Sequence, residues 1–471
     1  MLKKIKLHWQ ILIALVLAIF FGIMFPDMYK IDEQFFNNLK EREGYYHQLA
    51  EVVFGDDRGK VLSKRVFTEK LKRYIDESEY HKTSQLYIEA ATYNPYASKV
   101  IWMGTIFLRG LTMLIAPLVL SSIVSGVANI GTGTNLGRLG LKTFGYYITS
   151  SLLAIFTGLL MVNILTPGAG MNLPVPEHQQ QGINIGDISD TLIQIVPTNI
   201  FQSLSENHML SIIFFAILTG FFITRIRKAY RIFLTDMFNA FFELMMKITM
   251  FVIKFTPLGI FGIVVGVVAS QSDLLSLAKS MGVYMLAVAS ALIIHAVVTL
   301  PLLVRYVGKS NPVKHFRAMQ TPLLTAFSTS SSGATLPLTM TTVEQKSGVS
   351  NKISSFTLPL GATINMDGTA LYECVAAIFI AQAYGIDLSF GLQLVVVFTA
   401  LLASIGAAAV PMAGLVMITI VLTAVGLPLE GIGMILAVDR ILDMLRTATN
   451  VWSDSCGAVI IAKSEGEILR V

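Results

Sequence analysis

Charged residues are scarce in this chain. Asp, Glu, Lys and Arg make up 14% of its 471 residues, whereas a soluble domain carries about a quarter. The charges also cluster, so that apolar runs of about 18 or more residues recur, and each can cross a hydrocarbon core of about 30 Å as a helix. This distribution excludes an ordinary soluble domain and predicts an all-α membrane protein with several spans.

Cysteine is nearly absent as well. The two cysteines, Cys374 and Cys456, both lie in apolar stretches, so they indicate neither a disulfide framework nor a metal site. The sequence has no cluster of His and Cys at metal-ligand spacing, and no basic patch interleaved with aromatic residues outside its short loops. We therefore attribute the net charge of +5 to cations that fix membrane topology, and we expect no nucleic-acid partner.

The first apolar run, Ile11 to Phe25, follows three lysines and has the general form of a signal peptide. It lacks a small-residue cleavage site and ends at Pro26 and Asp27, so we interpret 1–27 as an uncleaved first span. A cleaved signal peptide is the alternative.

Further spans are expected within 99–306. Lys and Arg gather before the first span and after every second one, for example at Arg138 and Lys142, while the intervening loops hold few cations. The positive-inside rule then places the N-terminus of this multi-pass protein in the cytoplasm, and we expect a plasma membrane, the inner membrane in a bacterium. The expected membrane segments in this part of the chain are 8–26, 101–128, 143–166, 195–224, 235–265 and 275–306.

Residues 28–98 form a polar insertion between the first two spans, on the extracytoplasmic side. Stretches such as Ser63 to Asp76 have the charge pattern of helices, which predicts a small helical appendage. Its residues indicate no specific function, and we assign it a structural or trimer-capping role.

The composition of the sequence changes after Arg317, where Ser, Gly, Pro and Asn interrupt the apolar stretches. Polar backbone at membrane depth is tolerated only where it is buried in protein or lines a cavity, so these interruptions predict a binding site. We expect a re-entrant hairpin at 318–345, a broken helix at 350–386, a second re-entrant hairpin at 390–426, a last helix at 428–462 and a cytoplasmic tail at 463–471.

Each interruption has its own chemistry. The serine-rich tip at 328–337 suits a carboxylate, because helix N-termini carry partial positive charge, although a cytoplasmic loop is the alternative. Asn365 and Asp367 would unwind a helix and free carbonyl oxygens for a cation such as sodium. The small residues at 403–414 suit a lid that closes over a ligand, or equally a helix-packing face.

The last helix carries a polar stripe on an apolar cylinder. Its members recur every three or four residues, so they share one face, and such a stripe inside a membrane must face protein or water. A buried ion pair that only fixes packing is the alternative. The stripe consists of Asp439, Asp443, Arg446, Thr447, Asn450 and Asp454.

From about residue 100 onward the chain resembles the glutamate and neutral amino acid transporters, the sodium:dicarboxylate symporter family. The resemblance rests on the serine-rich tip, the string NMDGT at 365–369 and the run DRILDMLRTATNV at 439–451. It implies a homotrimer of eight spans and two re-entrant hairpins, with a scaffold domain and a transport domain that moves as an elevator. It does not cover 28–98.

The resemblance also implies residue roles in binding a small acidic amino acid. Asp443 is expected to bind the ammonium group, and Arg446, with Thr369, the side-chain carboxylate. Having both Asp443 and Arg446 favours glutamate or aspartate, since a planar guanidinium matches a carboxylate bidentately. The other residues implied at this site are Ser331, Ser332 and Asn450 for the α-carboxylate, Val410 and Gly414 in the lid, and Thr447.

Co-transported sodium ions are implied at three sites. One would use Gly361, Asn365, Asn450 and Asp454. A second would use Tyr147, Ser150, Ser151, Asn365 and Asp367. A third would use groups at Thr363, Met366, Ser404, Ile405 and Ala407. Protons are a further coupling candidate through Glu373, because a carboxyl group in an apolar helix favours its protonated form. A permanently protonated or hydrogen-bonded packing role for Glu373 is the alternative.

Two departures from the family pattern lie near these sites: Trp452 and Ser453 stand before Asp454, and Ala409 stands in the second tip. The competing functions are a neutral amino acid or C4-dicarboxylate symporter of the same fold, an anion channel, and a membrane enzyme with a serine nucleophile. The enzyme needs a base near its serine, and we interpret the nearest histidine candidate, His295, as a packing residue.

Overall fold

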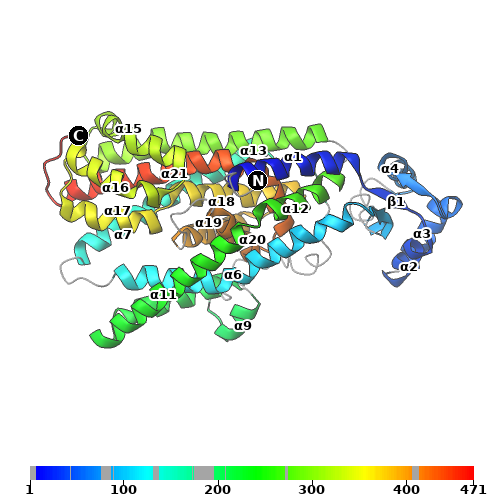
Figure 1. Cartoon of the computed structure of the whole chain (residues 1–471), viewed down its shortest axis with the longest axis horizontal. Coiled ribbons are helices and arrows are strands. Elements are labelled where there is room, and N and C mark those ends of the chain that lie inside the picture. The colour runs from blue at the N-terminus through cyan, green and yellow to red at the C-terminus, as the bar shows by residue number, and fades with distance from the viewer. Residues whose placement is uncertain are drawn as a thin grey trace. The chain divides into compact units, whose positions relative to one another are not determined.

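A computed structural model of the chain consists almost entirely of helices (Figure 1). Two compact units are present: 1–108 with 254–278, and 109–253 with 279–471. Helices α6 (Ser98–Ile130) and α13 (Leu274–Ile294) each contribute residues to both. The structure describes residues 7–42, 44–75, 86–88, 90–130, 137–171, 173, 196–206, 208–270, 274–405 and 413–471.

Glycines allow close helix packing in the first unit. Helix α1 (Leu7–Met24) lies against α12 (Thr256–Ser270), where a Cβ atom on Gly22 would overlap the side chain of Val268. The start of α6 also approaches α12, because a Cβ atom on Gly262 would lie 2.5 Å from the backbone nitrogen of Gly104. Small residues at such crossings let two backbones approach within van der Waals contact, which is a main source of helix association in a membrane.

The polar insertion folds around an aromatic core of its own. The Tyr29 and Phe67 rings stack with centroids 4.6 Å apart, and Phe54 stacks on Phe67 at the same separation. The charge pattern indicated helices here, and helices are present, but they accompany a three-stranded antiparallel sheet of order β2-β1-β3 in which Tyr29 pairs with both Leu62 and Thr92. The elements are β1 (Met28–Lys30), α2 (Glu33–Arg42), α3 (Gly44–Phe54), a 3₁₀ turn (Gly55–Asp57), β2 (Val61–Ser63), α4 (Lys64–Lys72) and β3 (Thr92–Tyr93).

A buried carboxylate ties this insertion together and makes its stability depend on pH. Asp57 accepts hydrogen bonds from Lys70 and Lys60, and these bonds, with Lys70 contributing most, lower the pKa of Asp57 below its ordinary 3.8. Because the folded pKa is the lower one, the stabilisation is present above the ordinary value and is lost as pH falls through the lowered one. We expect backbone amides of α4 to lose protection from hydrogen exchange in that acid range.

The variant Asp57→Asn should show weaker protection of α4 at neutral pH and no acid step, once intrinsic exchange rates are corrected for pH. Asp56→Asn is the matched control, since Asp56 is exposed. An acid step that persists unchanged in Asp57→Asn would contradict this assignment.

The second unit contains the segments that the sequence predicts to carry the chemistry. Several of its helices continue through short π-helical turns, at His295–Thr299, Leu303–Val307 and Val343–Ser347. The helices that lie wholly in this unit are α7 (Gly137–Leu165), α9 (Ile200–Ser205), α10 (Met209–Ile223), α11 (Lys228–Ile253), α14 (Leu300–Leu302), α15 (Pro312–Thr329), α16 (Ser332–Thr342), α17 (Asn351–Ile364), α18 (Asp367–Ala383), α19 (Phe390–Ile405), α20 (Ala413–Ala424) and α21 (Ile432–Ser464).

Two of the expected spans are each divided in the structure. The segment expected at 235–265 comprises α11 and α12, and Pro257 at the second position of α12 explains the break, because proline cannot donate a hydrogen bond to the preceding turn. The segment expected at 195–224 comprises the short α9, capped by Asn199, and α10.

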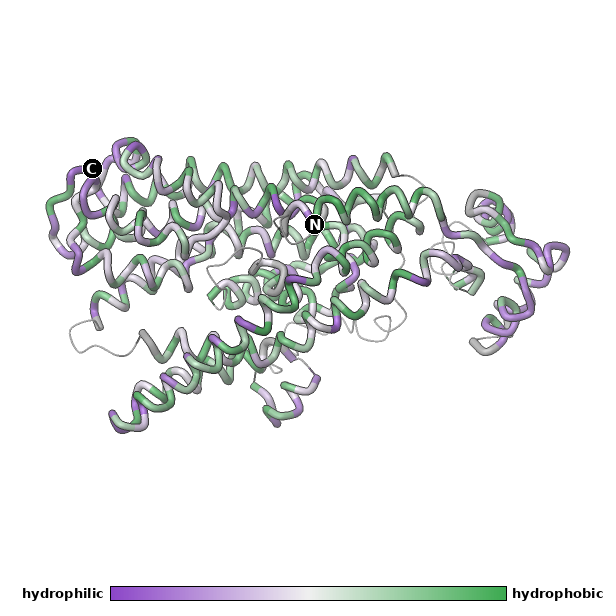
Figure 2. The backbone as a smooth tube through the Cα atoms, in the orientation of Figure 1, coloured by the Kyte–Doolittle hydropathy of each residue, from purple (hydrophilic) through white to green (hydrophobic). Residues whose placement is uncertain are grey.

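Several helices are apolar enough to cross a membrane. Among the described residues, four helical segments meet the length and composition of a span: 98–128, 138–165, 277–307 and 351–383. A fifth is added if α11 and α12 make one span. Figure 2 shows hydrophobic residues along these helices and hydrophilic residues in the insertion. The chain is thus a multi-pass helical membrane protein.

Helix α18 is the centre of the second unit. Each of its residues is buried except Gln382, and α7 packs so closely that a Cβ atom on Gly158 would lie 3.0 Å from the side chain of Leu371. The helix before it, α17, stops at Ile364, and Asn365 and Met366 leave helical geometry before α18 begins. The end of one helix and the start of another therefore meet in the protein interior.

Candidate functional site

The guanidinium of Arg446 lies in the interior of the second unit. Its Nη2 donates a hydrogen bond of 2.5 Å to Asp443 Oδ1, and its Nη1 lies 3.7 Å from Asp439 Oδ1. The Tyr372 ring of α18 lies beneath it, 4.3 Å from Cζ to the ring centroid. A Cβ atom on Gly414 of α20 would collide with it, so a larger residue at that position would require the guanidinium to move.

Some polar atoms in this cluster can form further hydrogen bonds. Arg446 Nη1 and Asp443 Oδ2 are buried and make no hydrogen bond within the described part of the chain, although Asp443 Oδ2 lies 3.6 Å from Arg440 Nη1. Buried charged atoms are normally hydrogen-bonded, and unsatisfied ones call for a partner. A donor and an acceptor side by side can bind a ligand that carries both a carboxylate and an ammonium group.

The amino end of α18 is joined to α21 by Asn450. Its Oδ1 accepts a hydrogen bond of 2.8 Å from the backbone nitrogen of Gly368, and its Nδ2 donates to Thr369 Oγ1 at 3.2 Å. The absence of a side chain at Gly368 permits this approach, since a Cβ atom there would lie 2.6 Å from the carbonyl oxygen of Arg446. Thr447 is held differently, because its hydroxyl donates to the Asp443 carbonyl oxygen.

The serine-rich tip joins α15 to α16. Ser330 adopts a left-handed conformation with φ of 51°, and Ser331 caps α16 by accepting a hydrogen bond from the backbone nitrogen of Ala334 at 3.2 Å. Ser332 is buried at the first position of α16. The first helix of the hairpin expected at 318–345 begins at Pro312, where Asn311 caps it.

The break between α17 and α18 gathers oxygen atoms around Asp367. Ser151 donates to Oδ1 at 2.6 Å and Ser150 to the same atom at 3.3 Å. Ser453 of α21 donates to Oδ2 at 2.5 Å, and His295 Nε2 lies 3.1 Å from it. Four side chains from three other elements therefore converge on one carboxylate.

Asn365 connects this carboxylate to a second one. Its Oδ1 accepts from Ser150 at 3.1 Å and its Nδ2 donates to Asp454 Oδ1 at 2.9 Å. Gly361 lies against Asp454 and Tyr147, since a Cβ atom there would be 2.5 Å from Asp454 Oδ1 and 2.8 Å from the Tyr147 hydroxyl. The structure thus brings together the members of the first two expected sodium sites apart from Asn450, which bonds to the start of α18.

This cluster offers oxygen atoms rather than soft ligands. No group of three or more His, Cys, Asp or Glu that could hold a metal ion occurs in the residues the structure describes. Hydroxyl, amide and carboxylate oxygens prefer hard cations, and the break in the helix adds backbone groups. The donor set therefore fits an alkali cation better than a transition metal.

The third expected cation site is only partly described. Thr363 and Ser404 turn their hydroxyls to their own helices, donating to the carbonyl oxygens of Leu360 and Leu401. Met366 is buried and Ile405 is half-buried. Ala407 of this site lies outside the described residues, as do Val410 and Ala409 of the expected lid.

Glu373 is fully buried in α18, and neither of its carboxyl oxygens has a hydrogen-bond partner in the described ranges. The hydrogen-bonded packing role considered for it therefore has no partner among these residues.

His295 and Tyr372 are site residues that the sequence interpretation missed. His295 was interpreted as packing, yet it is completely buried and contacts Asp367. An ionisable residue within an apolar span is functional by default, and that signal could have marked it. Tyr372 gave no such signal, because a tyrosine among apolar residues is ordinary.

The chain is similar to known amino acid transporters over most of its length. The chain is 36% identical over 411 residues to mouse excitatory amino acid transporter 3, covering 76% of this chain and 78% of that protein. It is 37% identical over 380 residues to the proton/glutamate-aspartate symporter of Escherichia coli, covering 78% and 85%. Excitatory amino acid transporter 1 of Ambystoma tigrinum is 35% identical over 415 residues, covering 76% of each.

The family profile described as the sodium:dicarboxylate symporter family matches residues 7–464, which includes the polar insertion within its span. The family and these relatives are transporters, so the chain is not a serine-dependent enzyme. The resemblance given by the three motifs is thereby confirmed: this chain belongs to the sodium:dicarboxylate symporter family.

Proposed function

We propose that this protein is a secondary active symporter that imports glutamate or aspartate together with sodium. The observation that carries the proposal is the buried pair of Arg446 and Asp443, 2.5 Å apart, in which Arg446 Nη1 and Asp443 Oδ2 make no hydrogen bond among the described residues. An acidic amino acid entering here would give Asp443 an ammonium group and Arg446 a carboxylate, so that one ion pair is exchanged for two. The names of the relatives support this substrate class.

The charges around the site explain why cations should accompany the substrate. Among the described residues, α18 and α21 bury five carboxyl groups and a single arginine, Arg446. A further anion is unfavourable in this environment unless a cation or a proton enters with it. We propose Asp367, Asn365 and Asp454, with Ser150 and Ser151, as the main cation ligands, as the family description as a sodium symporter suggests.

The rival substrates are less well supported. A neutral amino acid would leave the Arg446 guanidinium without a second anion, and a C4-dicarboxylate has no ammonium group for Asp443. The tip residues Ser331 and Ser332 remain our proposal for the α-carboxylate. Asn450 and Thr369, which are hydrogen-bonded to each other, would support that end of the ligand.

We further propose that the protein works as a homotrimer in the plasma membrane, with its N-terminus in the cytoplasm and a transport domain that moves as an elevator. These expectations rest on the family resemblance and on the distribution of loop cations. A trimer mass in native mass spectrometry, and labelling of cysteines introduced into loops on each side, would test them.

The function is tested by uptake into proteoliposomes. We expect labelled aspartate to accumulate when an inward sodium gradient is imposed, and unlabelled glutamate to compete better than serine or succinate. Uptake that is independent of sodium and of pH gradients would overturn the symport proposal. Flux of chloride without any substrate coupling would favour the anion channel.

A proton role for Glu373 makes a separate prediction. One coupled proton adds about 1.4 kcal/mol per pH unit of gradient, or about tenfold in accumulation ratio. We expect wild-type accumulation to respond to an inward acid gradient at constant sodium, and Glu373→Gln to lose that response while retaining sodium-driven uptake. The exposed Glu430, changed to Gln, is the matched control. An unchanged response in Glu373→Gln would leave Glu373 as a packing residue.

A further inference from the structure

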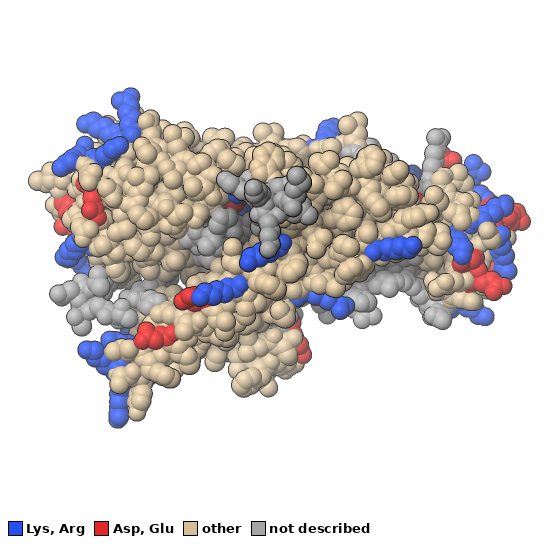
Figure 3. Space-filling view, viewed as in Figure 1, with Lys and Arg blue, Asp and Glu red and all other residues tan. Residues whose placement is uncertain are grey.

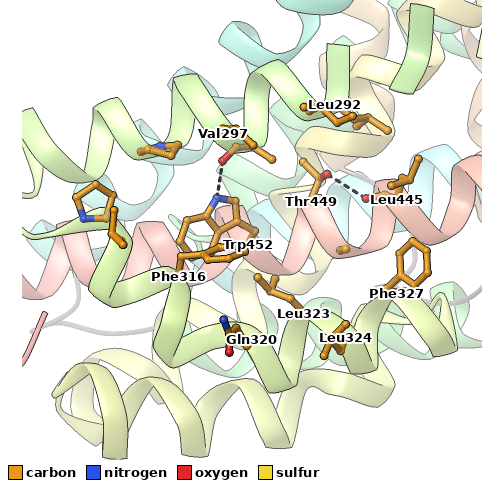
Figure 4. A pocket seen from close by; sticks show the side chains of 16 residues that line it. Leu292, Val297, Phe316, Gln320, Leu323, Leu324, Phe327, Leu445, Thr449 and Trp452 are labelled. Atoms are coloured by element: carbon orange, nitrogen blue, oxygen red, sulfur yellow. Dashed lines mark hydrogen bonds between the residues drawn. The ribbon is translucent and has the colours of Figure 1, made fainter. Parts of the chain in front are cut away.

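An apolar groove opens on the second unit away from the substrate and cation residues. It has a volume of about 660 Å³. Its walls are formed by α15, by α21, and by α13 together with the π-helical turn and α14 that follow it (Figure 4). Gln320 and Thr449 are the polar members of an otherwise apolar wall, and the Thr449 hydroxyl is satisfied by the carbonyl oxygen of Leu445. The volume falls within the range of ligand pockets, about 300 to 1,000 Å³.

The groove has a fixed floor and an open mouth. Trp452 is 3% exposed, and its indole nitrogen donates to the Ala296 carbonyl oxygen at 2.9 Å, in the π-helical turn. His315 stacks on the indole with ring centroids 5.1 Å apart. At the mouth Val297 is 67% and Leu324 70% exposed, so an apolar occupant can enter through this open side.

A second cavity continues the first toward a cation. It has a volume of about 500 Å³, shares Val297, Pro301 and Pro312 with the groove, and is lined by Arg305 and Tyr306. The apolar walls therefore lead directly to a guanidinium.

This cation, Arg305, belongs to a group of four basic residues around the start of α15. Arg305, Lys309, Lys314 and Arg317 are exposed and form no ion pair with any described residue. Figure 3 shows Lys and Arg side chains gathered where α15 begins.

The acidic residues at the end of α21 and beside α17 have other partners. Glu465 pairs with Arg138 and Lys142. Glu467 accepts hydrogen bonds from Ser350, and Glu344 accepts them from Asn351 and Ser354. The four cations thus present uncompensated positive charge beside an apolar groove.

We propose that this groove binds an anionic glycerophospholipid. Its acyl chain lies along the groove against Trp452 and Phe316, and its phosphate lies beside Arg305. The positive-inside rule places these cations at the cytoplasmic leaflet, where anionic lipids attract basic residues near the surface. Neither an apolar chain alone nor an anion alone uses both halves of the site.

The bound lipid would affect transport because the residue that it contacts, Trp452, is adjacent in the chain to a residue of the cation cluster. Trp452 precedes Ser453, whose hydroxyl donates to Asp367 at 2.5 Å. An occupant that presses on the indole therefore shifts a neighbour of the cation cluster. This part of the inference rests on the proposed function and predicts that anionic lipid changes the sodium concentration for half-maximal uptake.

The test uses the intrinsic fluorescence of Trp452. The full chain has three tryptophans, so Trp9→Phe with Trp102→Phe leaves Trp452 as the reporter. Dibrominated phosphatidylglycerol and dibrominated phosphatidylcholine, in turn, are diluted into unlabelled phosphatidylcholine nanodiscs, since bromine quenches indole fluorescence only at close range. We expect the anionic lipid to quench Trp452 at a lower mole fraction than the zwitterionic one.

Variants locate the site. Arg305→Gln should raise the half-quenching mole fraction of phosphatidylglycerol by roughly fivefold, as one lost cation contact implies, while the exposed Arg227→Gln leaves it unchanged. Val297→Phe, which fills the groove, should reduce quenching by both lipids. A variant in which Trp102 is the sole tryptophan provides the control, since Trp102 lies on α6 and is 53% exposed. Its quenching by dibrominated lipid should not change with Arg305→Gln.

Equal quenching by the two lipids, or equal effects of Arg305→Gln and Arg227→Gln, would overturn the proposal. Stronger quenching by dibromostearate than by phosphatidylglycerol would overturn it in favour of a free fatty acid. Shielding of Trp452 that increases with the number of chains per nanodisc would overturn it in favour of a second copy of the chain. The readout requires no transport, so its failure is distinct from failure of the proposed function.

Discussion

Arg446→Gln is expected to lower kcat/KM for aspartate uptake by roughly 30- to 5,000-fold. Truncating one partner of a buried charge pair costs about 2 to 5 kcal/mol, and Arg446 is buried against Asp443 and Asp439. Uptake of serine, which has no side-chain carboxylate, should fall far less. The two rates are measured with the same proteoliposome preparation, so that a change in protein content affects both equally.

Arg440→Gln is the matched control for this experiment. Arg440 also faces Asp443, at 3.6 Å, but its side chain is 37% exposed, and a pair in contact with solvent contributes about 0 to 1 kcal/mol. Its loss should change aspartate uptake by less than about tenfold. If Arg446→Gln reduces serine and aspartate uptake equally, Arg446 stabilises the fold and the substrate carboxylate binds elsewhere.

Asp367→Asn is expected to raise the sodium concentration for half-maximal uptake by more than about 100-fold. Groups one step removed from a metal contribute roughly 10- to 100-fold to its affinity, and Asp367 carries the charge on which four side chains converge. Ser453→Ala removes only a hydrogen-bond partner of that carboxylate. It should raise the sodium concentration for half-maximal uptake by roughly 10- to 100-fold.

The matched control is Asp387→Asn, since Asp387 is exposed. It should leave the sodium dependence at its wild-type value. Normal uptake with unchanged sodium dependence in Asp367→Asn would remove this carboxylate from the cation site, and the Asp454 side of the cluster would become the better candidate.

The two predictions depend on each other through Asn365 and Asn450. Asn365 links Asp367 to Asp454, while Asn450 joins α21 to the first residues of α18. A cation that orders the start of α18 would therefore also order the residues that hold the ligand. Such shared ordering is a physical route to coupled binding of substrate and cation.

Much of the candidate site is determined by local sequence. Asp439, Asp443 and Arg446 share one face because the helical repeat places residues three and four apart side by side. A membrane environment makes such charges unfavourable unless they face protein or water, so their burial follows from the pattern. The break at Asn365 was likewise indicated by polar residues within an apolar helix.

Only the tertiary structure determines which side chains from other helices contact these residues. His295 is 72 positions and Ser150 is 217 positions from Asp367 in the chain, and no repeat within a helix states which other helix will pack against it. The same holds for the small sheet of the insertion, whose strands have two or three residues each, too few to show an alternating pattern. Periodicity fixes the face that a residue occupies, whereas the partner across that face depends on how distant helices pack together.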